Sequence, residues 1–177
     1  AFISGNSRRA DVQVINVDGT GRRSLTAGDS VPRRCSWSPD GTRIAFVSRR
    51  DGNAEIYVVG ADGTEPRNVT QHPGIDGSPA WSPDGSKIAF ESYRDGNTEV
   101  YIVDVDSANL QNITDHELAD GAPHWSPDGT TLAFASSRDG NWDVYVLEMG
   151  GAVLPGDVNG DDGVDIIDLV LVAQAFG

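Results

Sequence analysis

The amino-acid sequence predicts an all-β fold built from a repeated unit, and three observations support this prediction. First, the pentapeptide Trp-Ser-Pro-Asp-Gly occurs three times at intervals of 44 residues, at residues 37–41, 81–85 and 125–129. Second, every copy is followed by an Ala-Phe pair and then by Arg-Asp-Gly-Asn. Third, the chain of 177 residues contains 21 Gly and 9 Pro, a composition rich in turns. A fixed period of this length indicates a repeat architecture.

Each complete repeat is expected to hold four strands. In the second Trp-Ser-Pro-Asp-Gly copy these are residues 79–81, 87–92, 99–105 and 110–114. Between the first two strands, proline fixes φ, aspartate caps the turn and Gly85 takes a positive φ. Between the second and third strands, Asp-Gly within residues 94–97 is a strong hairpin signal. The unit is therefore a four-stranded antiparallel sheet.

The third strand of this unit is apolar on both faces. Val100 and Ile102 point one way, whereas Tyr101, Val103 and Val105 point the other way, because successive side chains of a strand alternate. Both faces must then be covered by neighbouring layers. Four-stranded sheets that pack face to face are the blades of a β-propeller. The sequence thus predicts a partial β-propeller over residues 1–148.

Counting the blades predicts an incomplete ring. The first repeat has only its second, third and fourth strands (residues 1–4, 11–17 and 23–26), and the last repeat stops after its third strand at Leu147. This makes about three and a half blades, whereas closed propellers have at least four. We expect the chain to be the C-terminal part of a larger propeller, or else one half of an assembly completed by a second copy. Its uncovered end faces predict self-association.

Composition excludes several classes of function. The net charge of −14 and the pI near 4.3 argue against a nucleic-acid or anionic-membrane partner, since both require a basic surface. No apolar run approaches 18 residues, so no membrane span is predicted. The single cysteine, Cys35, excludes an intramolecular disulfide and is expected to fill a strand position. No signal peptide is present, and an export signal is expected upstream of Ala1.

The repeat ends after Glu148, and a short linker at residues 149–155 leads into an acidic segment at residues 156–177. This segment has the spacing of an EF-hand calcium loop, which places oxygen ligands at positions one, three, five, seven, nine and twelve. Those positions are Asp157, Asn159, Asp161, Gly163 (through its carbonyl), Asp165 and Asp168. Asp162 stands at the sixth position, where glycine is preferred, which is expected to weaken calcium binding. The alternative is a merely acidic linker.

The repeated signatures also resemble a known family. Pro-x-Trp-Ser-Pro-Asp-Gly, Ile-Ala-Phe, Arg-Asp-Gly-Asn and Glu-Val-Tyr-Ile-Val are similar to the TolB-like Pro-Asp (WD40-like) propeller repeats, over residues 1 to about 150. The resemblance implies a propeller, usually six-bladed, in a secreted or periplasmic protein that binds other proteins or accompanies a catalytic domain. The acidic tail resembles one of the two repeats of a type I dockerin. It implies Ca²⁺ as the cofactor and a cohesin-like domain as the partner, and the alternative partner is a periplasmic or cell-surface protein.

Other candidate sites are weaker. His72 and His116 lie 44 residues apart in long loops, each with an aspartate four residues later, Asp76 and Asp120. They are expected to share one rim with the Arg-Asp-Gly-Asn turns, either as a ligand site or as turn chemistry. The tryptophans of the repeat are expected in the core, and Trp142 has no aromatic counterpart in the other copies.

Three classes of function remain. The first, which we favour, is a non-catalytic extracellular or periplasmic protein-binding propeller with a calcium-binding tail. The second is an accessory propeller of a secreted hydrolase, either prolyl-oligopeptidase-like or carbohydrate-active. The third is a structural element of the cell surface. No catalytic residue is predicted, because no serine or cysteine has a recognisable histidine and aspartate context.

Overall fold

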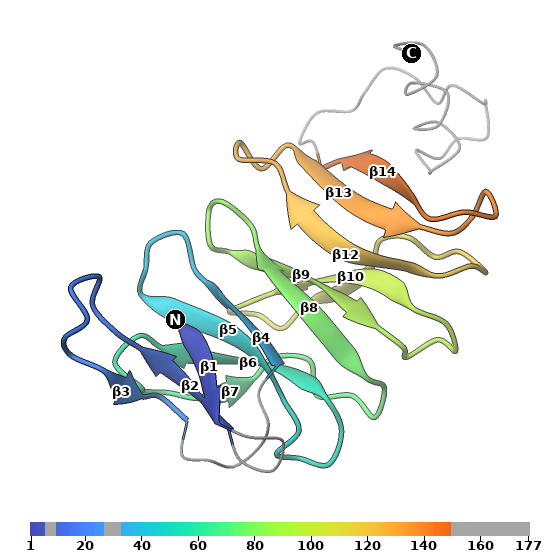
Figure 1. The fold of residues 1–177 in the computed structure, drawn as a ribbon. Coiled ribbons are helices and arrows are strands. Elements are labelled where there is room, and N and C mark those ends of the chain that lie inside the picture. Colours follow the sequence, from blue (N-terminus) through green and yellow to red (C-terminus); the bar gives the residue numbers. More distant parts are fainter. Residues whose placement is uncertain (6–9, 27–32, 150–177) are drawn as a thin grey trace.

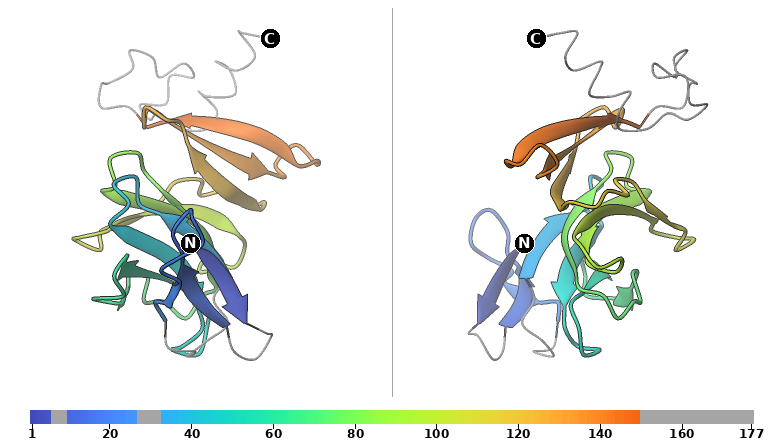
Figure 2. Two further views of the ribbon diagram at one scale, coloured as in Figure 1. Left: turned by 60° about the vertical axis from the view of Figure 1, so that its left-hand side comes forward. Right: turned by 90° about the vertical axis from the view of Figure 1, so that its right-hand side faces the viewer.

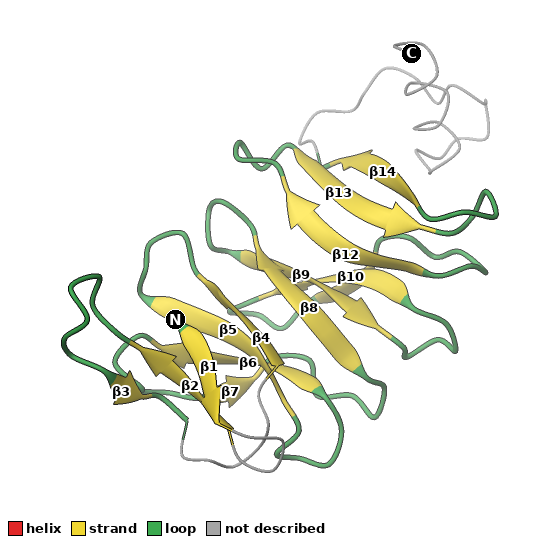
Figure 3. Ribbon diagram, viewed as in Figure 1, coloured by secondary structure: helices red, strands yellow, loops and turns green. Residues whose placement is uncertain are grey.

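A computed structural model describes residues 1–5, 10–26 and 33–149. This part of the chain folds into four antiparallel sheets, which we name A to D in chain order (Figures 1 and 3). Sheet A contains β1 (Phe2–Gly5), β2 (Ala10–Val14) and β3 (Arg23–Ser24). Sheet B contains β4 (Arg33–Trp37), β5 (Arg43–Ser48), β6 (Glu55–Gly60) and β7 (Arg67–Asn68). Sheet C contains β8 (Asp76–Trp81), β9 (Lys87–Ser92), β10 (Glu99–Asp104) and β11 (Leu110–Asn112). Sheet D contains β12 (Asp120–Trp125), β13 (Thr131–Ser136) and β14 (Asp143–Glu148).

The predicted all-β partial propeller is confirmed for these residues. The sheets follow one another in an open arc, with two complete four-stranded sheets between two three-stranded ones (Figures 1 and 2). Within the described residues, sheet A has no first strand and sheet D has no fourth, as the repeat predicts. The linker, the calcium loop and the helix expected after residue 148 lie outside the described residues. None of the described residues forms a helix that has the length and apolar character for a membrane crossing.

The turn between the first and second strands follows from its sequence. In the first copy, the Asp40 carboxylate accepts hydrogen bonds from Ser38 Oγ and from the backbone N–H of Thr42. The glycine that follows has φ of +69°, +72° and +74° in the three copies, Gly41, Gly85 and Gly129, as predicted. Because these bonds are local, the same hairpin forms in every complete repeat.

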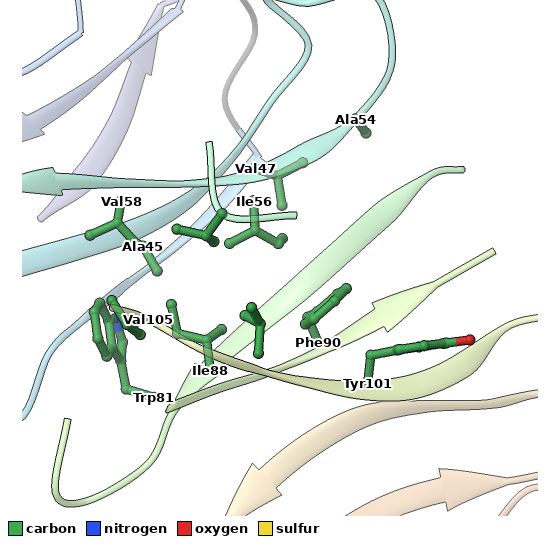
Figure 4. Packing of buried hydrophobic residues seen from close by; sticks show 12 residues of the cluster. Ala45, Val47, Ala54, Ile56, Val58, Trp81, Ile88, Phe90, Tyr101 and Val105 are labelled. Carbon is green, nitrogen blue, oxygen red and sulfur yellow. The ribbon is translucent and has the colours of Figure 1, made fainter. Parts of the chain in front are cut away.

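Side-chain alternation builds the core between the sheets. In sheet B, Ile44, Phe46, Tyr57 and Val59 pack against sheet A, while Ala45, Val47, Ile56 and Val58 pack against sheet C. Sheet C repeats the pattern, since Tyr101 and Val103 face sheet B whereas Val100 and Ile102 face sheet D. Figure 4 shows the layer between sheets B and C, where side chains of both sheets interlock. The predicted covering of both faces is therefore correct for the two central sheets.

The first strands of sheets B, C and D carry the same bulge. β8 contacts β4 and β12, the first strands of the sheets on either side, so these strands lie where the sheets converge. The register shifts at each bulge, and one residue there has a left-handed backbone: Arg34, Ser78 and Ala122, with φ of 51°, 50° and 51°. A bulge in the same place bends each first strand in the same way.

Two signature tryptophans differ from the prediction that all three lie in the core. Trp81 is buried, and its indole N–H donates to the carbonyl of Ser36 in the preceding first strand, at 3.1 Å. Trp125 is only half-buried, and Trp37 is exposed. Trp37 is exposed because sheet A, which precedes it, has no first strand among the described residues that could cover the ring or accept its hydrogen bond.

Candidate functional site

One edge of the arc carries a recurrent polar network, which we call the RDGN rim. It consists of the Arg-Asp-Gly-Asn turns at residues 50–53, 94–97 and 138–141, and of the loops at residues 69–75 and 113–119 that lead to the next sheet. The turns join the second and third strands of their sheets, whereas the Trp-Ser-Pro-Asp-Gly turns lie at the opposite ends of the strands. The expected sharing of one rim by turns and loops is confirmed: Asn53 Nδ2 donates to the His72 carbonyl at 2.7 Å.

Two arginines of the rim form buried ion pairs. The Arg94 guanidinium lies over the Tyr101 ring, 4.6 Å from its centroid, and its Nη2 is 3.3 Å from Asp76 Oδ1. Arg138 repeats the arrangement with Asp120, at 2.9 Å. In both pairs the arginine side chain is 8% exposed and the aspartate 0%. Since each buried charge faces an opposite charge and the arginine also stacks on an aromatic ring, the pairs fix the ends of the first and second strands to each other.

In sheets B and C, a buried glutamate at the start of the third strand holds the loops of the rim. Glu99 accepts hydrogen bonds from Asn97 Nδ2, from Thr114 Oγ1 and from the backbone N–H of His116. In sheet B, Glu55 likewise accepts a bond from the His72 N–H, at 2.9 Å. The carboxylates are thus satisfied by the loops that they position.

The histidines act within their own loops. His72 Nδ1 accepts a hydrogen bond from the Gly74 N–H at 3.0 Å, and His116 Nδ1 accepts one from the Leu118 N–H at 3.1 Å. The aspartates that follow them in sequence do not join them, because Asp76 and Asp120 turn inward to their arginines. Of the two sequence interpretations, turn chemistry is therefore the one that the contacts fit.

In sheets B, C and D, the third strand also carries a tyrosine whose hydroxyl bonds to the aspartate of the preceding turn. The hydroxyls of Tyr57, Tyr101 and Tyr145 donate to Asp51, Asp95 and Asp139. The hydrogen bond to Asp139 and partial burial raise the pKa of Tyr145 to about 12. In Tyr57 and Tyr101, burial and then the carboxylate bond raise the pKa of the phenol further. These phenols stay neutral, as hydrogen-bond donors of the turns.

Exposed apolar side chains rise from this network. Ile75 and Leu118 lie in the loops of the RDGN rim, and Tyr93 and Trp142 directly flank its turns in sheets C and D. These four side chains are 44–62% exposed. The Tyr93 N–H donates to the Ile75 carbonyl at 2.9 Å, so these two residues are adjacent. The arginines beneath them are paired with Asp76 and Asp120, so the apolar side chains stand above a buried and neutralised layer. Trp142, which the sequence singles out, is the most exposed of the four.

The remaining candidates from the sequence are Cys35 and the residues of the calcium loop. Cys35 is half-buried against the core between sheets A and B, and burial raises the pKa of its thiol, so the predicted strand role is confirmed. The calcium ligands Asp157, Asn159, Asp161, Gly163, Asp165 and Asp168 lie outside the described residues. Within the part that is described, no group of three or more His, Cys, Asp or Glu side chains is arranged to hold a metal ion.

Comparison with known proteins agrees with the repeated geometry. The family model of the TolB beta propeller domain matches residues 1–119. The chain belongs to this family. A search among curated protein sequences finds no match.

Solved structures of TolB share the fold. TolB from Acinetobacter baumannii is 25% identical with a TM-score of 0.70, and the match covers 82% of this chain and 36% of that one. A putative TolB from Agrobacterium tumefaciens is 24% identical with a TM-score of 0.70, over 82% of this chain and 53% of that one. A puromycin-hydrolyzing peptidase of Mycobacterium tuberculosis is 21% identical with a TM-score of 0.67, over 80% of this chain and 25% of that one. The chain spans between a quarter and about half of these proteins.

Proposed function

We propose that this TolB-family propeller segment is a non-catalytic protein-binding module of an extracellular or periplasmic protein, and that the RDGN rim of sheets C and D is its contact surface. The observation that carries the proposal is the group of four exposed apolar side chains, Ile75, Tyr93, Leu118 and Trp142, on a rim whose two buried arginines are paired with aspartates. Aromatic residues of this kind are enriched in protein interfaces.

The network beneath the apolar groups favours recognition without rearrangement. Tyr93 immediately precedes Arg94, whose guanidinium is held by Asp76 and by the hydroxyl of Ser92 at 2.8 Å. Leu118 is fixed through its carbonyl, which accepts a bond from Asn97 Nδ2 at 3.3 Å. A surface held in place in the free protein loses less conformational entropy on binding.

The experiment is a site-directed photo-crosslinking comparison. A photoreactive residue at position 93 or 142 should capture a specific protein from the extracellular or periplasmic fraction, whereas the same residue at Thr42, on the opposite edge, should not. The captured protein is then purified, and its affinity for Tyr93→Ser and Trp142→Ser variants is measured against the unsubstituted protein. Each variant should bind at least about tenfold more weakly, the usual effect of truncating an interface anchor. Equal crosslinking at both edges, or unchanged affinity, contradicts the proposal.

We further propose that the tail binds Ca²⁺ through Asp157, Asn159, Asp161, the Gly163 carbonyl, Asp165 and Asp168, and that the loaded tail attaches the propeller to a cohesin-like domain. The support is the spacing of hard oxygen donors, the kind that calcium prefers. Calorimetric titration should detect one calcium site that Asp161→Ala abolishes and Asp62→Ala, in a turn of sheet B, leaves intact. Circular dichroism should gain helical signal with calcium. Without calcium binding, the anchoring proposal fails.

The second candidate is an accessory propeller of a secreted hydrolase. Solved structures with the same fold include the peptidase above and an oligogalacturonate lyase in complex with manganese, which is 19% identical with a TM-score of 0.65. At this identity the likeness concerns the fold alone. The two candidates differ in what accompanies the propeller, since a hydrolase needs a catalytic domain elsewhere in the same protein. Assays of the intact protein with short peptides and oligogalacturonides separate them, because such a domain cleaves one of these substrates whereas a binding protein leaves both uncleaved.

A further inference from the structure

The spaces between sheets B and C and between sheets C and D are built alike at the edge that carries the Trp-Ser-Pro-Asp-Gly turns. In each space a tryptophan ends the first strand of the following sheet, Trp81 in one and Trp125 in the other. The turns of neighbouring sheets touch in both, since an added Cβ on Gly85 would lie 3.7 Å from Pro39 and one on Gly129 would lie 3.5 Å from Pro83. The two spaces differ in what occupies them.

An arginine fills the space between sheets B and C. The Arg43 guanidinium lies over the Trp81 ring, 5.0 Å from the centroid. Its Nη2 donates to the Gly85 carbonyl at 3.0 Å, and its Nη1 lies 3.6 Å from Asp106 Oδ1. A planar guanidinium can stack on an indole and donate to a carbonyl at its edge at the same time. The contacts of Arg43 therefore show how a space between two neighbouring sheets can hold a guanidinium.

The corresponding space between sheets C and D is open. The residue 44 positions after Arg43 is Lys87, whose ammonium turns to the Asp104 carboxylate instead of lying over the tryptophan. A cavity of about 240 Å³ remains, and its lining consists of Ser82, Pro83, Asp84, Lys87, Trp125, Asp128, Gly129 and Met149. Trp125 Nε1, unlike Trp81 Nε1, has no hydrogen-bond partner among the described residues. This space is closed less tightly around its tryptophan than the one before it.

The cavity also carries net negative charge, because two carboxylates line it and the one cation of its lining, Lys87, is paired with Asp104. Hydrogen bonds from the turn, chiefly from Ser82 and Ser126, hold the pKa of Asp84 and Asp128 at about 2, so both are ionised at neutral pH. In the first two turns a hydroxyl also donates to the second carboxylate oxygen, as Ser86 Oγ does to Asp84 Oδ2 at 2.8 Å. In the third turn, Thr130 Oγ1 donates to Oδ1 of Asp128. Among the described residues, Asp128 Oδ2 therefore accepts no hydrogen bond.

We propose that this cavity binds the guanidinium of an arginine residue in a partner peptide, stacked on Trp125, hydrogen-bonded to the Gly129 carbonyl and facing Asp128. The ligand takes the place that Arg43 occupies one repeat earlier. A lysine ammonium fits less well, because it cannot stack as a plane on the indole. This site lies at the opposite edge from the RDGN rim, so it does not depend on the function proposed for that rim.

The test measures binding of three capped tripeptides, with arginine, lysine or citrulline between two glycines, to the full chain. The indole N–H resonances in NMR spectra report the titration, and a Trp125→Phe variant assigns the signal. The arginine peptide should bind about tenfold more tightly than the citrulline peptide, which has the same shape without the charge. Arginine and citrulline peptides of equal affinity overturn the proposal.

Matched variants test the place of binding. Lys87→Arg supplies the chain's own guanidinium, as Arg43 does in the neighbouring space, and should abolish binding while leaving the urea unfolding midpoint intact. Asp128→Asn should weaken binding several-fold by removing the counter-charge, whereas Asp40→Asn, the same change in the first turn, should not. Binding that survives Lys87→Arg, or that responds equally to both asparagine variants, contradicts the assignment.

Discussion

Sheets B and D contain equivalent strands in different surroundings. Ile56 in β6 is 0% exposed, whereas Val144, its equivalent in β14, is 76% exposed. The next residues on that face, Val58 and Val146, are 2% and 49% exposed. Sheet C covers this face of sheet B, and among the described residues no sheet covers the same face of sheet D. The repeat thus specifies which faces are apolar, while the neighbouring sheet determines whether a given side chain is buried.

Equivalent arginines of the RDGN rim also differ in their surroundings, and here we expect the largest difference in stability. Arg94→Met leaves the Asp76 carboxylate buried without a counter-charge and should lower the free energy of unfolding by about 3–5 kcal/mol. Arg50 stacks on Tyr57 in the same way, 4.5 Å from the ring centroid, but no described carboxylate pairs with it. Arg50→Met should therefore cost about 1 kcal/mol, the contribution of the stacking. Urea unfolding of both variants measures the difference, and equal losses would show that the buried pair is not what distinguishes them.

The second effect concerns the apolar faces themselves. Ile56→Ala removes a fully buried side chain and should destabilise by about 2–4 kcal/mol, through lost burial and an unfilled cavity. Val144→Ala at the equivalent position of sheet D should change stability by less than about 0.5 kcal/mol, because that side chain is exposed. The denaturant midpoints of the two variants, measured at the same protein concentration, test both expectations. A large loss at Val144 would mean that its face is covered in solution, for example by a second copy of the chain.

Substitutions in the Trp-Ser-Pro-Asp-Gly turns should have the same effect on stability in every sheet, because the geometry of these turns is local. Gly41, Gly85 and Gly129 all have φ near +70°, and a Cβ added to any of them meets only open space or ordinary contacts. Alanine at each should cost about 1–2 kcal/mol through left-handed strain, whatever covers the sheet. Thermal unfolding of the three alanine variants tests this expectation. If Gly85→Ala costs much more than the other two, the neighbouring sheets influence the turn.

The smallest effect is a dependence of stability on pH from the same turns. Hydrogen bonds from Ser38, Ser82 and Ser126 lower the pKa of Asp40, Asp84 and Asp128 from 3.8 to about 2. Since the folded-state pKa is depressed, the contribution is fully present above pH 3.8 and is lost as the pH falls through about 2. Replacing all three aspartates by asparagine should flatten the stability profile in this window. Parallel profiles of the variant and the unsubstituted protein would contradict the assignment.

Much of the fold was accessible from the sequence because its signals are local and repeated. The strand alternation around Tyr101, the Asp-Gly hairpins and the 44-residue period predicted the sheets and the incomplete blades at each end. The bulge at Ser78 was not predicted, because a serine in the left-handed region leaves no distinctive sequence signal.

The site was less predictable because its partners are distant in sequence. Asp76 follows His72 by four residues, yet its charge pairs with Arg94 across two strands. The exposure of Tyr93 and Trp142 and the difference between Arg43 and Lys87 depend on neighbouring sheets, which a single repeat does not specify.

The central claim, that equivalent side chains differ in burial because of their neighbours, is tested most directly by thiol labelling. Cys35 is the single cysteine, so a Cys35→Ser background allows one thiol to be placed at Val58 and, separately, at Val146. The thiol at position 146 should react with a water-soluble reagent nearly as fast as in the unfolded chain. The thiol at position 58 should react only as fast as the protein unfolds, which slows labelling by orders of magnitude at the stability usual for a domain. Equal protection at the two positions would contradict the account.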